Sequence, residues 1–445
     1  MKTKRISFLL RTAFVLFFAV SAFSGALADE SYYIDGGTKS VAATELTGNE
    51  TITDGKILLT SGWYIVKGSN ITYTMILKCE SGDINLILAD GAHLTINNSY
   101  ECLYVQDGSL NIYRQSGGTG ILTVASTGNH GIYAKVNVNI YGGNIHATGG
   151  SSDGSGIYAG SSVTIAGGTV NTTGNKGIDS NGSVTITGGI VSAYGTSYVG
   201  INANSFSTTA GTVTGLVRDN GNKKITLYGR TFIKDGNWNT LCLPFDATTA
   251  QLGSGVTVKE LDATNTSLDD SGKLTLTFKS ASSIESIEAC KPYLVKWPSG
   301  TNVANPYFTG DSEAPSISDA PLREITSSDE KVKFVGQFSP FAITAENIDA
   351  ILYIASGNKI GYSASARELK YCGAHFWVQP KKGAGVRTIE ADFGDGDKMT
   401  ITGVDSLTSE CNNTDGIFYD LQGRRVAQPV QKGLYIVNGH KVLVK

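Results

Sequence analysis

The sequence predicts an all-β protein: a right-handed parallel β-helix at the N-terminus, then an antiparallel β-sandwich-like domain, then a small C-terminal β-unit. Three observations lead to this prediction. A motif of alternating apolar residues and paired glycines recurs every 21 to 25 residues in the first half. Glycine supplies 54 of the 445 residues, or about 12%, compared with ~7% in average proteins. Between residues 222 and 400, no long segment has the 3.6-residue apolar period of an amphipathic helix. With 40% hydrophobic and 17% charged residues, the chain is also too apolar to be disordered.

Residues 1–28 have the pattern of a secretory signal peptide. Three basic residues among the first five precede an uncharged apolar run from Thr12 to Phe23, and Ala26-Leu27-Ala28 supplies the small residues of a cleavage site. The run is too short to span a bilayer comfortably, and no second candidate follows it. We expect a mature protein that begins at Asp29, has no transmembrane helix and works outside the cytoplasm; a retained membrane anchor is the alternative.

The β-helix prediction for residues 29–217 rests on three copies of one motif. Val138-x-Ile140-x-Gly142-Gly143-x-Ile145 recurs at 163–170 and at 184–191. A Gly-Ile pair lies six residues before each copy, and the isoleucines at 132, 157, 178 and 201 are 25, 21 and 23 residues apart. This period is typical of stacked coils of short strands, about 4.8 Å apart. The expected core columns are Val138/Val163/Val184, Ile140/Ile165/Ile186, Ile145/Val170/Val191 and Ile132/Ile157/Ile178.

Cysteine positions suggest disulfide bonds in an exported protein. All six cysteines follow the predicted signal peptide, and none forms a C-x-x-C pair. Cys79 and Cys102 are 23 residues apart, about one coil, so neighbouring coils would bring their α-carbons within disulfide range. Two buried thiols are the alternative. Cys242 and Cys290 could bridge the following domain in the same way.

Residues 218–400 have a different texture, because all nine prolines lie at or after Pro244 and the strand-like runs are irregularly spaced. Short runs punctuated by Gly, Pro, Asn and Asp fit an antiparallel sandwich. The tryptophans Trp238, Trp297 and Trp377 are expected in its core rather than as platforms for sugar stacking. The predicted strand runs are 224–230, 240–243, 256–261, 273–279, 293–297, 332–337, 351–354, 376–379 and 388–393.

Residues 401–445 are expected to form a separate small β-unit. Asn438-Gly439 between two apolar runs is a strong signal for a two-residue hairpin loop. The tail resembles the C-terminal sorting domain of type IX secretion substrates, in which a G-x-x-V turn, a G-[IL]-Y strand and a final lysine end the chain. The resemblance implies that the export machinery is a partner and that a Gram-negative bacterium displays the protein on its outer membrane or releases it. A tail that only caps the molecule is the alternative. The matching residues are Gly423, Val426, Gly433, Leu434, Tyr435, Lys441 and Lys445.

The repeat resembles carbohydrate-binding, pectate-lyase-like β-helix proteins, whose coils read G-I-D-x-x-G-x-[VL]-x-I-x-G-G. Residues 156–174 and 177–195 carry this resemblance. It implies binding of acidic plant polysaccharide with calcium, without lyase activity. An acidic residue follows Gly-Ile in that family, and Asp179 does so here. Asp179 is therefore the one candidate calcium ligand, and no other cofactor is expected.

The position after Gly-Ile supplies the candidate ligand-binding residues. Since the isoleucine points inward, the next residue should point outward. Tyr133, Tyr158, Asp179 and Asn202 are therefore expected to form one outward row that binds a polysaccharide or a host surface glycan by hydrogen bonding and stacking. Lys176 could form a salt bridge with Asp179.

No catalytic constellation appears in the repeat. Asp107, Asp153 and Asp179 are far apart in sequence, whereas glycosidases need paired carboxylates. His130 is expected to be solvated, and neither it nor His146 has the partners of a triad or metal site. Nearly balanced charge (36 Lys+Arg, 39 Asp+Glu) argues against nucleic-acid binding. We expect a non-catalytic, carbohydrate-binding or adhesin-like protein; a cryptic polysaccharide lyase or hydrolase and a structural spacer without a small ligand are the alternatives.

Overall fold

The computed structural model of the chain is almost entirely β-structure, which confirms the predicted class. One short helix, α1 (Thr249–Leu252), and one 3-10 turn, η1 (Ser356–Asn358), are the helical elements among the described residues. The predicted signal peptide up to residue 27 lies outside the described residues. The structure describes residues 28–34, 37–150, 152–279, 284–379, 386–394, 396–402, 418–419, 425–426, 433–437 and 440–444.

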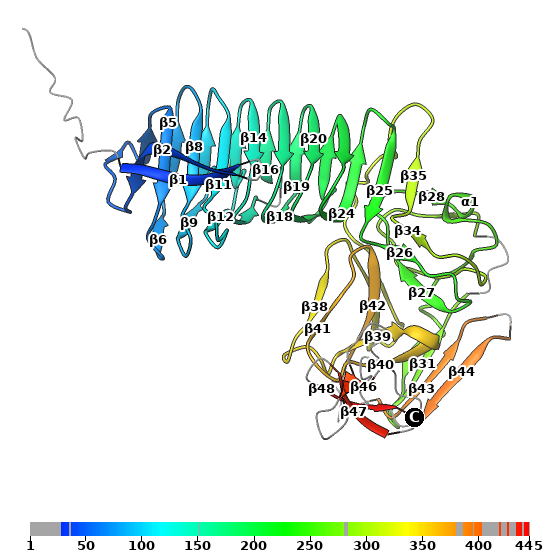
Figure 1. Cartoon of the computed structure of the whole chain (residues 1–445). Coiled ribbons are helices and arrows are strands. Elements are labelled where there is room, and N and C mark those ends of the chain that lie inside the picture. The colour runs from blue at the N-terminus through cyan, green and yellow to red at the C-terminus, as the bar shows by residue number, and fades with distance from the viewer. Residues whose placement is uncertain are drawn as a thin grey trace, which may run out of the picture.

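The N-terminal part is a β-solenoid with three faces, and each face is a sheet of parallel strands (Figure 1). Each coil contributes one strand to each face. Face A contains β5 (Gly62–Val66), β8 (Ile84–Leu88), β11 (Leu110–Arg114), β14 (Asn137–Ile140), β17 (Ser162–Ile165), β20 (Ser183–Ile186) and β23 (Ser205–Thr208). Face B contains β4 (Lys56–Leu59), β7 (Ile76–Cys79), β10 (Leu103–Val105), β13 (Ile132–Ala134), β16 (Ser155–Ala159), β19 (Lys176–Ser180) and β22 (Ile201–Ala203). Face C contains β6 (Ile71–Tyr73), β9 (His93–Asn98), β12 (Ile121–Ser126), β15 (Asn144–Thr148), β18 (Thr169–Gly174), β21 (Ile190–Gly195) and β24 (Thr212–Asp219).

The predicted core columns are present in the predicted register. Val138 pairs with Val163, and Val163 pairs with Val184. Successive members also pair in the column of Ile140 on face A, the column of Ile132 on face B and the column of Ile145 on face C. Every member of the four columns is fully buried. Burial of one such side chain stabilises a protein by about 1.5–3 kcal/mol, so the columns are the main source of the solenoid's stability.

The second glycine of each pair turns the chain from face A to face C. Gly168 has a φ of +85°, in the left-handed region that favours glycine. A Cβ atom on Gly168 would lie 2.4 Å from the carbonyl oxygen of Gly143, one coil earlier. Gly189 has the same relation to Gly168, at 2.5 Å. The glycine pairs therefore allow both the turn and the close approach of successive coils.

The two ends of the solenoid are closed by antiparallel strands. At the N-terminal end, β1 (Ala28–Ile34) pairs with β2 (Gly37–Leu46) and lies across face A, so that Tyr33 reaches Arg114 (Figure 1). At the other end, β24 passes through the predicted domain boundary at residue 217. It pairs in parallel with β22 and antiparallel with β25 (Lys224–Tyr228), which pairs with β35 (Tyr307–Thr309). The Tyr371 hydroxyl donates to the carbonyl oxygens of Gly215 and Tyr228 at this junction.

Residues 220–402 form several small, mainly antiparallel sheets, and a strand overlaps each of the nine predicted runs. β31 and β43 pair in parallel. Trp238 and Trp297 are buried, 3% and 1% exposed, in two separate cores, as expected of core residues. Trp377, expected in the core as well, is only partly buried, against a small separate cluster. The larger sheets are β27 (Trp238–Leu241)–β33 (Tyr293–Lys296)–β29 (Thr257–Lys259), β30 (Ser267–Leu268)–β31 (Lys273–Thr277)–β43 (Thr388–Asp392)–β44 (Lys398–Thr402), and β36 (Glu324–Thr326)–β37 (Val332–Gln337)–β42 (Gly373–Val378)–β39 (Ile351–Ala355)–β40 (Lys359–Tyr362).

The C-terminal unit contains a four-stranded antiparallel sheet. β47 (Gly433–Val437) pairs with β48 (His440–Val444), and Val437 lies opposite His440, which confirms the predicted hairpin with two residues between its strands. β45 (Phe418–Tyr419) joins β47 to β46 (Arg425–Val426). Gly433 and Tyr435 of the sorting-domain pattern are in β47, Val426 is in β46 and Lys441 is in β48. Leu434 is also in β47, and the remaining two predicted tail residues, Gly423 and Lys445, lie outside the described residues.

The expected disulfide bonds are not present, because the four candidate cysteines carry free, buried thiols. The register explains this for the solenoid pair. Cys79 lies opposite Val105, while the carbonyl of Cys102 accepts from the backbone N–H of Leu77. Cys102 is therefore displaced by three residues from the position opposite Cys79. In the part after the solenoid, the Cys290 N–H donates to the carbonyl of Leu243, beside Cys242, and both thiols are free.

Because His375 in β42 is buried, we expect the stability of the folded protein to depend on pH. It is 1% exposed, and its Nδ1–H donates to Gln337 Oε1 at 2.8 Å. Burial lowers the pKa of His375 to about 4, from 6.5 in a solvated chain. In the unfolded state His375 is therefore protonated as the pH falls through about 6.5. In the folded state it stays neutral until about pH 4. Stability from this group is complete above pH 6.5 and is lost as the pH falls, by roughly 3 kcal/mol in all.

Urea unfolding of the wild type and of His375→Gln between pH 7 and pH 4 measures this effect. The wild type should lose more stability than the variant across that range. Parallel pH curves for the two proteins would contradict the assignment.

Candidate ligand-binding site

The outward row predicted after the Gly-Ile pairs is present on face B. Tyr133 pairs with Tyr158, Tyr158 with Asp179, and Asp179 with Asn202. Each residue follows a fully buried isoleucine, so it stands on the outer side of its strand. The row is longer than the sequence indicated and continues in register in both directions. The face B row comprises Leu58, Lys78, Tyr104, Tyr133, Tyr158, Asp179, Asn202 and Arg218.

Four members of the row were missed because their coils lack the Gly-Ile pair. Lys78 and Tyr104 follow Leu77 and Leu103, which occupy the same inward column as the isoleucines. The available signal was the alternation in Leu103-Tyr104-Val105, where two buried residues flank an outward tyrosine. Strand alternation alone would therefore have placed Tyr104 in the row.

The tyrosines of the row stack on one another. The ring centroids of Tyr133 and Tyr158 are 5.1 Å apart with an interplanar angle of 13°, and the ring of Tyr104 packs on Tyr133 at 4.8 Å with a tilt of 52°. Neighbouring rings therefore cover the faces of Tyr133, contrary to the expectation of open stacking platforms. The edges and hydroxyl groups are the parts that can meet a ligand, and the Tyr158 hydroxyl already accepts from Asn181 Nδ2 at 2.9 Å.

His130 lies beside the row and is not solvated as predicted. Its ring stacks on Tyr158 with centroids 4.8 Å apart, and its Nδ1 accepts from the backbone N–H of Ser155 at 3.0 Å. Burial lowers the pKa of His130, so the neutral imidazole is the favoured form. Next to it, Asn129 Nδ2 donates to Glu101 Oε1 at 2.7 Å. The glycine-flanked corner thus serves as a packed support for the tyrosine stack.

Asp179 is held by two neighbours. Lys176 Nζ lies 2.6 Å from Asp179 Oδ2, which confirms the predicted salt bridge, and Asn202 Nδ2 donates to Oδ1 at 2.8 Å. The Asp179 side chain is only 11% exposed. A calcium ion would have to displace the Lys176 ammonium group from this carboxylate. Within the described residues, no group of three or more His, Cys, Asp or Glu side chains could hold a metal ion.

The remaining acidic and histidine candidates do not join the row. Asp107, Asp153 and His146 are exposed. Asp153 therefore has the solvated position expected for it.

A shallow groove of about 490 Å³ lies beside the N-terminal end of the row. Three successive coils contribute to it, and no sequence pattern pointed to it. Its lining residues are Asp54, Gly55, Lys56, Thr74, Ile76, Asn97, Asn98, Ser99 and Tyr100.

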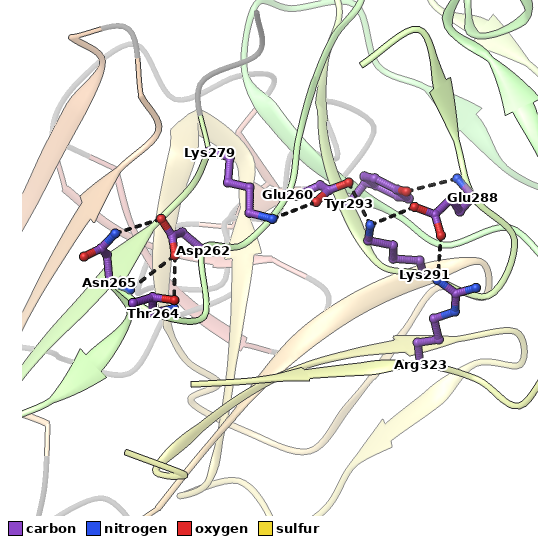
Figure 2. Close-up of polar contacts among 9 residues, drawn as sticks. All are labelled: Glu260, Asp262, Thr264, Asn265, Lys279, Glu288, Lys291, Tyr293 and Arg323. Carbon is purple, nitrogen blue, oxygen red and sulfur yellow. Dashed lines mark hydrogen bonds and ion pairs between the residues drawn. The ribbon is translucent and has the colours of Figure 1, made fainter. Parts of the chain in front are cut away.

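A second polar cluster, in the part after the solenoid, was also not predicted. Figure 2 shows charges that alternate from Lys279 through Glu260, Lys291 and Glu288 to Arg323. Lys291 Nζ lies 2.7 Å from Glu260 Oε1 and 3.0 Å from Glu288 Oε1. Hydrogen bonds from Lys291 and Arg323 lower the pKa of Glu288. Because both carboxylates are already paired, this cluster ties together four chain segments and offers no free acid or base.

Comparison of the chain with protein-family models, curated proteins and solved structures finds no match. Among the described residues, no helix is both long and apolar enough to cross a membrane.

Proposed function

We propose that the protein is an exported, non-catalytic glycan-binding protein, displayed on the bacterial surface or released from it, and that the face B row is its binding surface. The regular repeat of the row carries the proposal. From Lys78 to Arg218 a polar side chain recurs once per coil, and consecutive tyrosine rings are 4.8 and 5.1 Å apart. A linear polysaccharide likewise repeats its hydroxyl groups from unit to unit. A surface with one hydrogen-bonding group per coil can therefore bond several successive units.

The chemistry of the row favours a hydroxyl-rich ligand. Phenol groups and the Asn202 amide both donate and accept hydrogen bonds, and the single carboxylate, Asp179, is neutralised by Lys176. The row has no continuous basic stripe of the kind that binds nucleic acid. The signal-peptide pattern and the tail that resembles a type IX sorting domain support export, and an adhesin-like role on host glycans would use the same surface.

Replacing Tyr133 and Tyr158 together by phenylalanine should weaken glycan binding. The substitutions keep the ring stack and remove only the two hydroxyl groups. Loss of two hydrogen bonds at about 1 kcal/mol each lowers affinity by roughly tenfold to thirtyfold. A glycan array, with and without EDTA, identifies the ligand, and titration calorimetry then compares the variant with the wild type.

Tyr141→Phe is the matched control, since Tyr141 lies on the face A side and stacks on Tyr113. It should leave affinity unchanged. A wild-type protein that binds nothing on the array would favour a structural spacer. Release of reducing sugar or unsaturated uronate from pectins would instead indicate a lyase or hydrolase.

A further inference from the structure

The groove at the N-terminal end of the row offers an open aromatic face, which the row itself lacks. Tyr100 is 64% exposed, and among the described residues no other ring stacks on it. The apolar C–H face of a sugar ring packs well on such a surface, because the aromatic ring provides a flat, weakly hydrated area. The stacked rings of Tyr133 and Tyr158 cannot offer this contact.

The loop that carries Tyr100 is tied to the coils on both sides. Asn98 Oδ1 accepts from the Tyr100 N–H at 2.9 Å, and Asn98 Nδ2 donates to the carbonyl of Thr74 at 3.1 Å. The N–H of Thr127, one coil later, donates to the carbonyl of Asn98 at 3.0 Å. Tyr100 is thus presented from a backbone with a defined position, so a ligand need not order the loop.

Opposite Tyr100, a tight turn supplies charged groups. Asp54 and Gly55 have φ values of 50° and 72° and join β3 (Ile52–Thr53) to β4, as in a two-residue hairpin turn. The side chains of Asp54, Lys56 and Asn97 form no hydrogen bond or ion pair with the described part of the chain. Asp179 differs, since both of its oxygens are occupied. The groove therefore holds an acceptor, a donor and an amide that are available to hydroxyl groups.

We propose that the groove binds one pyranose ring of a neutral glycan, with the C–H face of the ring on Tyr100 and its hydroxyl groups on Asp54, Lys56 and Asn97. The opposite charges of Asp54 and Lys56 cancel, so the groove has no net positive charge that would favour an acidic sugar over a neutral one. Lys56 pairs with Ile76 on the outer side of face B, two residues before Leu58 of the row. The next sugar units can therefore follow the row. This inference rests on the proposed function and identifies where the glycan is anchored.

Calorimetric titration with defined probes tests the inference. The probes are maltohexaose, cellohexaose and xylohexaose as neutral chains, and hexagalacturonate as an acidic one. The wild type should bind at least one neutral probe more tightly than hexagalacturonate. Tyr100→Ala should lower that affinity by roughly fivefold to tenfold, whereas Tyr100→Phe keeps the ring face and should retain it. Asp54→Asn should also weaken binding, because it removes the carboxylate acceptor. Asparagine tolerates the positive φ of this turn position, so the turn is kept.

Tyr307→Ala is the matched control, because Tyr307 is 62% exposed but lies on β35, at the opposite end of the solenoid from the groove. It should bind like the wild type. Full affinity in Tyr100→Ala, together with loss in the Tyr133→Phe/Tyr158→Phe protein, would overturn the groove while leaving the row as the binding surface. Tighter binding of hexagalacturonate would overturn the class of sugar. No binding of any probe by a wild-type protein that binds another glycan on the array would overturn the groove as a site for neutral sugars and leave the proposed function standing; a wild type that binds nothing on the array would overturn both.

Discussion

Ile165→Asp is expected to unfold the β-solenoid. Ile165 is fully buried in β17, between Ile140 and Ile186 of the neighbouring coils. The substitution removes a large apolar side chain, at a cost of about 2–5 kcal/mol. It also places a carboxylate where no cation or hydrogen-bond donor can reach it, which costs several kcal/mol more. The sum is comparable to the entire stability of a typical domain, about 5–15 kcal/mol.

Circular dichroism and urea unfolding of the purified variant measure this loss. The matched control is Thr164→Asp, at the adjacent outward and partly exposed position. That change should alter stability by no more than about 0.5 kcal/mol. A folded Ile165→Asp protein with an unchanged urea midpoint would contradict the assignment of Ile165 to a dry core.

Gly168→Ala is the second change with a large expected effect. The added methyl group would meet the backbone of Gly142 and Gly143, with its nearest contact at 2.4 Å, in a residue whose φ is +85°. The left-handed conformation alone costs about 1–2 kcal/mol for a side-chain-bearing residue. Backbone atoms of a packed coil cannot move aside as a flexible side chain can. We expect a total loss of about 3 kcal/mol or more.

Gly91→Ala separates the two causes. Gly91 has a φ of +77°, but a Cβ atom there would meet nothing within 4 Å. It should therefore show the conformational cost alone, about 1–2 kcal/mol. Thermal or urea unfolding of both variants gives the comparison. Equal losses would mean that contact between coils at Gly168 does not limit stability.

The sequence predicted the row better at its centre than at its ends. Tyr133, Tyr158, Asp179 and Asn202 share a local Gly-Ile mark, and the register places them together. Tyr104 belongs to the same row but lacks that mark, since the early coils use other residues before the outward position. Repeats identify equivalent positions only where the repeat is regular, and end coils are usually irregular.

The cysteines show a different limit of sequence reasoning. A separation of one coil suggested a bond between Cys79 and Cys102, yet the strand register opposes Cys79 and Val105. Coil length varies in this region, so sequence separation alone does not fix which residues face each other. The same uncertainty hid the groove, whose residues come from three coils.

What the sequence determined by itself is the coil: its strands, its glycine corners, its buried columns and the outward side of face B. These follow from residue alternation and backbone freedom, which act within a few neighbouring residues. Only the tertiary structure decided that the tyrosines cover one another, that His130 packs beneath them, and that Tyr100 stands open beside Asp54 and Lys56. These relations depend on distances between side chains of different coils. Such distances are set when the coils stack.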